Sequence, residues 1–109
     1  MNILGEVKGK NIVIVDDLTA TASSICEAAV ALKKAGALKI FAAVTHPVLS
    51  GPAIERIEKG PFEEFIVSDT IPSPKHPKIK VLSVAEILGE AIRRIHNEES
   101  VSSLFTERV

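Results

Sequence analysis

The sequence feature that most constrains the fold is an apolar stretch, residues 13–15, that ends in the adjacent carboxylates of Asp16 and Asp17. Small and hydroxyl-bearing residues follow, and a helical pattern begins near Ile25. A continuous apolar run of this kind is typical of a buried strand in a parallel sheet. The pattern therefore predicts a strand that carries two acids to its carboxyl end, followed by a tight turn into a helix.

Similar patterns alternate along the rest of the chain. We expect strands at residues 11–16, 39–45, 62–68 and 78–82, and helices at residues 23–35, 50–58 and 83–98. Alternation of this kind favours parallel pairing with right-handed crossovers. The order β-α-β-α-β-β-α predicts an α/β fold of three layers, in which helices flank a mainly parallel sheet.

The predicted element ends depend on a few residues with known preferences. Gly36 and Gly60 should end the first two helices, and Ser50 and Ser83 should cap the second and third. His46-Pro47 should end the second strand, and the three prolines within residues 70–77 predict a loop. Cys26 lies beside the apolar stripe of the first helix and is expected to pack there.

Composition limits the classes of protein that fit. A chain of 109 residues suits one domain, residues 1–109, and its net charge of −1 offers no basic surface for nucleic acid. No apolar run approaches the roughly 20 residues that cross a bilayer. Charged residues interrupt the first ten positions, so no signal peptide is expected, and one cysteine cannot form an internal disulfide. These features predict a cytoplasmic protein without nucleic-acid or membrane partners.

The acid pair and the turn after it suggest a binding site. A helix start has unpartnered N–H groups and a positive dipole end, which favour a phosphate. Carboxylates beside it suit sugar hydroxyls or a divalent cation, so the residues predict a site for a phosphorylated sugar. The alternative is an unliganded strand end with the hydroxyls of Thr19, Thr21, Ser23 and Ser24 capping the helix.

Other polar residues carry weaker signals. The three histidines, His46, His76 and His96, lack metal-ligand spacing, although His46 ends a strand parallel to the first. Lys75, Lys78 and Lys80 are expected to form a solvated face.

Residues 13–24 resemble the phosphoribosyl diphosphate motif of type I phosphoribosyltransferases, in which two apolar residues and two acids precede a run of small residues and Thr. Residues 45–51 (THPVLSG), 68–72 (SDTIP) and 91–105 (AIRRIHNEESVSSLF) resemble, in the same order, the C-terminal half of bacterial ribose-phosphate pyrophosphokinase. The resemblance covers nearly the whole chain.

This resemblance implies an enzyme that transfers the diphosphoryl group of ATP to ribose 5-phosphate to make phosphoribosyl diphosphate for nucleotide biosynthesis. Asp16 and Asp17 would then hold the ribose hydroxyls with Mg²⁺ nearby. Thr21, Ala22, Ser23 and Ser24 would bind the 5-phosphate, and Ser100, Ser102 and Ser103 a regulatory phosphate or nucleotide between subunits.

The chain departs from the family pattern in sequence and in length. Ala20 replaces an acid, and Ala22 and Ser23 replace glycines. Of these, Ser23 is expected to matter most, because glycine allows close backbone approach or a positive φ more readily than serine. The family chain is about three times as long, as a two-domain protein should be. We therefore expect ATP to bind only with the missing half, no catalysis by this chain alone, and a homo-oligomer formed through exposed apolar surface.

Two other functions fit part of the pattern. A receiver domain also has an acid pair after its first strand, and Asp69 after the third predicted strand would be its phosphoacceptor. A fifth strand and a late strand-end lysine, which receivers need, are not clearly present. A non-catalytic scaffold or regulatory protein with the same fold is the other alternative.

Overall fold

The computed structural model describes residues 3 and 5–106, so the two ends of the expected domain, residues 1–2, 4 and 107–109, lie outside the described part. The strands are β1 (Ile12–Thr19), β2 (Ile40–Pro47), β3 (Glu64–Ser68) and β4 (Ile79–Leu82), and the helices are α1 (Ser23–Lys34), α2 (Ala53–Lys59), α3 (Ala85–His96) and α4 (Ser103–Thr106). This is the predicted element order with one short helix added in the tail.

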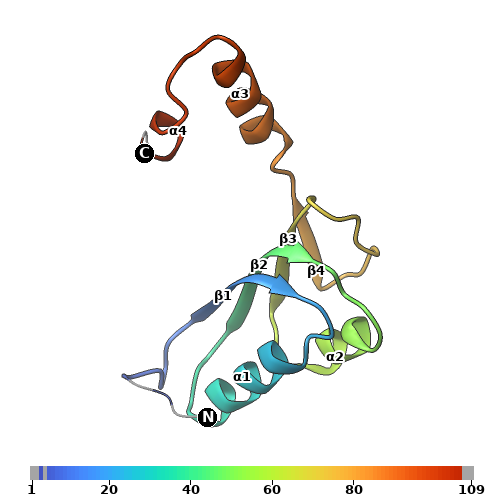
Figure 1. The fold of residues 1–109 in the computed structure, drawn as a ribbon. Coiled ribbons are helices and arrows are strands. Elements are labelled where there is room, and N and C mark those ends of the chain that lie inside the picture. Colours follow the sequence, from blue (N-terminus) through green and yellow to red (C-terminus); the bar gives the residue numbers. More distant parts are fainter. Residues whose placement is uncertain (1–2, 4, 107–109) are drawn as a thin grey trace.

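The strands form one sheet in the order β1-β2-β3-β4, and every neighbouring pair is parallel. The predicted α/β fold with a parallel sheet is therefore confirmed. When successive crossovers run in the same direction along a sheet, right-handedness places their helices on one face. Figure 1 shows α1 and α2 side by side below the sheet.

The core lies between the sheet and these two helices. Ile40, Ala42 and Val44 project from β2 toward the helices and are at most 3% exposed, while Phe65 of β3 and Ile57 of α2 are completely buried. Helix α1 buries Ile25 and Ala29, which are four residues apart on one face. Gly36 follows the helix at φ 101°, which confirms it as the predicted terminating glycine.

The opposite face of the sheet is open in the described part of the chain. Strand residues alternate between the two faces, and Val13 and Val15 of β1 are 59% and 78% exposed, as Leu82 of β4 is at 62%. The described residues thus supply a sheet and one helical layer. The predicted three-layer fold also has helices on this open face. Helix α3 does not provide them, because it extends away from the sheet (Figure 1).

Helices α3 and α4 form an arm that stands off the sheet. The expected apolar face of α3 is present, but none of its residues is buried, and Ile92 and Ile95 are 68% and 66% exposed. The radius of gyration is 16.4 Å, whereas a compact chain of about 100 residues has about 13 Å. The arm accounts for the difference in shape (Figure 1).

Several predicted boundaries are wrong. Strand β1 continues beyond Asp16 to Thr19, because Leu18 and Thr19 pair with His46 and Pro47 of β2. His46-Pro47 therefore extends β2 instead of breaking it, since a proline at a strand end forgoes no essential ladder bond.

Both predicted serine caps are also wrong. Pro52 is the N-cap of α2 and Val84 that of α3, each without a side-chain cap bond. Ser50 uses its backbone instead, where its carbonyl accepts from Ala53 N at 3.2 Å. Ser83 Oγ accepts from Ala85 N at 3.1 Å one position before the cap.

Lys78 is not part of a solvated face. Its Nζ donates to the carbonyls of Ile57, Glu58 and Gly60 at 3.4, 2.7 and 2.9 Å. These carbonyls lie at the C-terminal end of α2, where the helix dipole favours a cation. A lysine on the strand-entry loop thus fixes α2 against the sheet.

Candidate functional site

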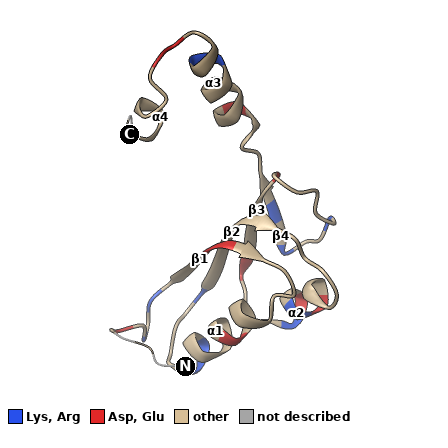
Figure 2. Cartoon of the chain, in the orientation of Figure 1, with Lys and Arg blue, Asp and Glu red and all other residues tan. Residues whose placement is uncertain are grey.

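The acid pair lies near the carboxyl end of β1, where Figure 2 shows it as the red segment of that strand. Because adjacent strand residues project to opposite faces, Asp16 lies on the face that α1 covers and Asp17 on the open face. Asp16 is half-buried and Asp17 is exposed. Asp17 N donates to Asp16 Oδ1 at 2.8 Å. The two carboxylates therefore lie on opposite faces of the sheet, close to the carboxyl end of β1.

The turn between β1 and α1 contains a left-handed residue. Ala22 has φ 64° and ψ 16°, is the N-cap of α1 and is 2% exposed. Ser23 is the first residue of α1 and has no positive φ, so the residue of this turn that adopts a positive φ is Ala22 and not Ser23. The strained position is Ala22, where an L-residue is disfavoured by about 1–2 kcal/mol.

The carbonyls of this turn point into the protein. Thr19 O accepts from Val48 N and Leu49 N at 3.0 and 3.2 Å, and Ala20 O accepts from Ser50 N at 2.8 Å. Thr21 O accepts from the guanidinium of Arg56, Nη1, at 3.1 Å, and Ala22 O accepts from Cys26 N at 3.1 Å. Four successive carbonyls are thus bonded to protein groups.

The N–H groups of the turn have the opposite character. Within the described chain, the backbone N–H groups of residues 21–25 make no hydrogen bond to protein. A left-handed residue followed by helical ones gathers such groups into a concave anion-binding nest. The predicted phosphate-binding residues Thr21, Ala22, Ser23 and Ser24 all lie in this nest.

The capping alternative for the hydroxyls does not match the structure. Helix α1 has no side-chain cap bond. Thr19 is 5% exposed and packs at the end of β1, whereas Thr21 and Ser24 are exposed and Ser23 is half-buried. Three of the hydroxyls therefore stay near the solvent side of the nest.

A magnesium site at the acid pair would need ligands from a bound molecule. Residues 3 and 5–106 contain no group of three or more His, Cys, Asp or Glu side chains that could hold a metal. Mg²⁺ is commonly held by one or two carboxylates together with waters and substrate oxygens. Asp16 and Asp17 fit that arrangement and could not form a closed protein cage.

A hydroxyl network at the ends of β2 and β3 was not predicted from the sequence. Ser68 Oγ and Thr70 Oγ1 both donate to Thr45 O, at 2.5 and 3.1 Å. His46 Nδ1 lies 2.9 Å from Thr70 Oγ1. The relevant signal was the position of polar residues after two parallel strands, because such ends meet at one edge of the sheet.

Asp69 has a structural partner at each carboxylate oxygen. Ser83 Oγ donates to Oδ2 at 2.6 Å and Val84 N donates to Oδ1 at 2.9 Å, and these bonds lower the pKa of Asp69. The carboxylate therefore fixes the start of α3. It is not arranged as a free phosphoacceptor.

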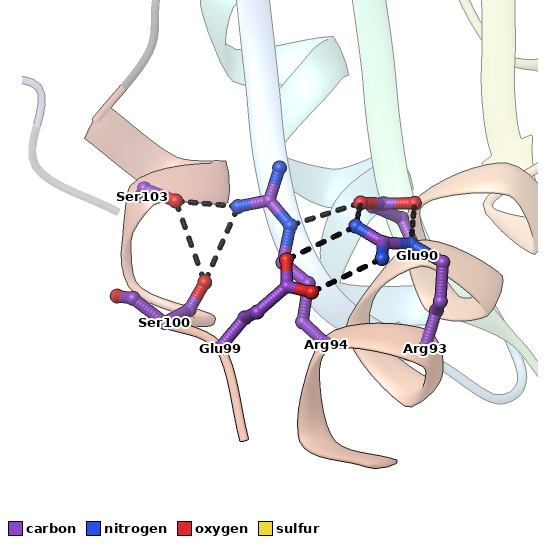
Figure 3. Close-up of polar contacts among 6 residues, drawn as sticks. All are labelled: Glu90, Arg93, Arg94, Glu99, Ser100 and Ser103. Atoms are coloured by element: carbon purple, nitrogen blue, oxygen red, sulfur yellow. Dashed lines mark hydrogen bonds and ion pairs between the residues drawn. The ribbon is translucent and has the colours of Figure 1, made fainter. Parts of the chain in front are cut away.

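The predicted regulatory serines lie together in the arm, away from the nest. Ser100 Oγ and Ser102 Oγ are 3.0 Å apart, and Arg94 donates to Ser100 O at 3.3 Å and to Ser103 Oγ. Figure 3 shows Arg94 between Glu90 on one side and Ser100 and Ser103 on the other.

The same cluster contains ion pairs between α3 and its following segment. Arg93 binds Glu90 at 2.7 Å and Glu99 at 3.3 Å (Figure 3). Hydrogen bonds from Arg93, then from Arg94, lower the pKa of Glu90 to about 2. The carboxylates in turn raise the pKa of Arg93 above its usual value.

A groove of about 790 Å³ lies between α1 and α2, and Ser23, Cys26 and Arg56 are among its lining residues. Neither acid of the pair lines it, so the groove meets the candidate site only at Ser23 of the nest. Burial raises the pKa of the Cys26 thiol, although the positive charges of Arg56 and Lys78 oppose this. Cys26 packs against the core, as predicted.

Residues 1–106 match the family described as "Phosphoribosyl synthetase-associated domain". The chain belongs to this family. It is 54% identical to a ribose-phosphate pyrophosphokinase of Xanthomonas campestris over 98% of this chain and 35% of the relative. It is 53% identical to that of Chlorobaculum tepidum over 99% of this chain and 34% of the relative.

A solved structure of phosphoribosylpyrophosphate synthetase from Mycobacterium smegmatis is also similar, with a TM-score of 0.84 and 36% identity over 87% of this chain and 33% of that one. The chain thus spans about a third of the length of the relatives that it matches. The family assignment replaces the receiver-domain alternative. No described helix is long and apolar enough to span a bilayer.

Proposed function

We propose that this chain is the part of a ribose-phosphate pyrophosphokinase that binds ribose 5-phosphate or phosphoribosyl diphosphate. The observation that carries the proposal is the nest of free N–H groups at residues 21–25, formed around the left-handed Ala22. Such a nest suits the 5-phosphate, because it offers several donors and a positive helix end. The resemblance in sequence and fold to enzymes of that name supports the same ligand.

The two acids would bind the sugar end of the same molecule. Asp16 and Asp17 lie within one strand and one turn of the nest, at the sheet edge where parallel α/β proteins bind ligands. In this role they accept hydrogen bonds from ribose hydroxyls. With a bound phosphate, the same carboxylates suit Mg²⁺, which would neutralise charge that builds on the phosphates.

The proposal extends to the remaining part of the enzyme and to the arm of this chain. We infer that the chain corresponds to a C-terminal portion, that ATP binds only with the remaining part of the enzyme, and that Ser100, Ser102 and Ser103 contribute to a regulatory anion site. The open faces of the sheet and of α3 support a homo-oligomer, since large apolar patches favour association. The chain alone should release no AMP from ATP and ribose 5-phosphate, and sustained release would contradict this part.

Titration calorimetry with ribose 5-phosphate and Mg²⁺ tests the binding proposal. The chain should bind ribose 5-phosphate more tightly than ribose, and Asp16→Asn and Asp17→Asn should each weaken binding by about tenfold, because each removes a charged acceptor. Glu63→Gln is the control, since it removes the same charge from an exposed residue just before β3. Absence of binding by stable oligomers would favour the scaffold alternative.

A further inference from the structure

Arg56 contacts the turn from a helix that carries none of the predicted site residues. Its Nη1 donates to Thr21 O at 3.1 Å, across 35 residues of sequence. Among the described side chains, no other forms a hydrogen bond to the backbone of residues 20–22. The guanidinium thus binds the residue directly before the left-handed Ala22.

The backbone of Arg56 has a fixed position. It lies on α2 between Ala53 and Ile57, which are both 0% exposed and hold the helix against the core. Arg56 N donates to Pro52 O at 3.0 Å, and Arg56 O accepts from Gly60 N at 2.8 Å. The fold therefore fixes the backbone position from which the exposed Arg56 side chain reaches Thr21 O.

The charge of Arg56 is not used in an ion pair within the described residues, in contrast to the neighbouring Lys59, which binds Glu55 at 2.7 Å. A cation that bonds a carbonyl withdraws that oxygen from the anion face of the turn. It also places a positive charge near the helix start, where a phosphate is favoured. Both effects favour the binding of an anion at the turn.

We propose that Arg56 is a positioning residue for the phosphate nest: it holds Thr21 O inward, and so keeps Ala22 left-handed and the N–H groups of residues 21–25 directed at the anion. The inference rests on the proposed function for its ligand. In this role Arg56 contacts the carbonyl side of the turn and does not touch the sugar phosphate. A left-handed alanine is disfavoured by itself, so the surrounding contacts must hold it in place.

Calorimetry with ribose 5-phosphate and Mg²⁺ on matched variants measures the effect. Arg56→Gln should weaken binding about tenfold, because a charged hydrogen bond that shapes the nest is lost. Lys59→Gln removes an equal charge one turn along α2 without contacting the nest, and should change affinity less than about twofold. Arg56→Lys keeps the charge without the planar fork and should lie between the two.

A second substitution separates positioning from simple loss of stability. If Arg56 acts by holding Ala22 left-handed, Ala22→Gly should recover a large part of the affinity lost in Arg56→Gln, since glycine adopts that conformation without strain. A purely structural role for Arg56 on α2 gives no recovery. Equal binding by wild type and Arg56→Gln, or loss of equal size in Lys59→Gln, overturns the inference.

Amide hydrogen exchange without any ligand keeps this inference distinct from the proposed function. Arg56→Gln should speed exchange of the amides that donate to the carbonyls of the turn, Ser50 N to Ala20 O and Cys26 N to Ala22 O, relative to wild type and Lys59→Gln, while the β2 amides remain protected. If the wild type binds no ribose 5-phosphate but this local change occurs, the proposed ligand fails and the positioning role stands. If exchange at the turn is unchanged, the positioning role fails.

Discussion

The body of the molecule and its arm contain the same kind of amphipathic helix but treat it in opposite ways. In the body, α1 and α2 bury Ile25, Ala29 and Ile57 against the sheet. In the arm, α3 has an equally clear apolar stripe, yet Ile87 and Leu88 are 51% and 52% exposed. The comparison teaches that an apolar stripe predicts a helix. Whether the stripe is buried depends on whether another apolar surface of the fold lies next to it.

Different interactions hold the two regions. The body depends on close packing of aliphatic and aromatic side chains, such as the edge-to-face pair of Phe62 and Phe65 with ring centroids 5.2 Å apart. The arm depends on polar contacts among Glu90, Arg93, Arg94 and Glu99 (Figure 3), of which the Arg94–Glu90 pair is partly buried and the others are more exposed. Exposed ion pairs contribute little, typically below about 1 kcal/mol. The arm should therefore unfold locally before the body does.

The largest expected difference in unfolding free energy is between an apolar residue truncated in the body and one truncated in the arm. Phe65→Ala removes a completely buried ring, and should lower the free energy of unfolding by about 3–5 kcal/mol. Ile92→Ala in the exposed stripe should change it by less than about 0.5 kcal/mol. Urea denaturation followed by circular dichroism measures both. Similar losses in the two variants would show that the arm packs against something in solution.

A smaller effect is expected where a polar contact supports the body. Lys78→Met keeps the aliphatic stem but removes three hydrogen bonds to the end of α2, and should cost about 1–2 kcal/mol of unfolding free energy. Lys75→Met is the control, because Lys75 is exposed in the loop between β3 and β4. Equal urea midpoints for the two variants would mean that the carbonyls of α2 are as well satisfied by water.

The smallest expected effect is a loss of stability of the arm at acid pH. The pKa of Glu90 is lowered from 4.5 to about 2 by its arginine partners. A lowered carboxyl pKa means that the stabilisation is complete above pH 4.5 and is lost as the pH falls through about 2. NMR titration of the Glu90 carboxyl should show this value, and Arg93→Gln should raise it toward 4.5. An unshifted titration in the wild type would indicate an arm without the ion pairs.

The sequence predicted the kinds of element well and their ends less well. Apolar runs and helical stripes gave every strand and long helix, because burial on a sheet or one helix face imposes those periods. Boundaries failed where pairing with a neighbour decided them, as at Thr19 and Pro47. No local pattern could show that β2 continues beside β1. This pairing extends β1 past the acid pair to Thr19.

The candidate site divides in the same way. Asp16, Asp17 and the small residues 21–24 could be identified from the sequence, since their types and order suit a sugar phosphate. The contact from Arg56 could not, because it comes from a helix 30 or more residues away, and the sequence did not show that Ala22 and not Ser23 takes the positive φ. The polar network of His46, Ser68 and Thr70 likewise requires knowledge of which strand ends meet.

The sequence by itself determined the α/β class, the chemistry of the acid pair and small-residue turn, and the family, because these depend on residue types and their order. The tertiary structure decided which way each group faces. It placed Asp16 and Asp17 on opposite faces of β1, turned four carbonyls of the β1–α1 connection inward, and left one face of the sheet and the stripe of α3 exposed. Direction and burial arise from contacts between distant segments, and local sequence patterns do not contain them.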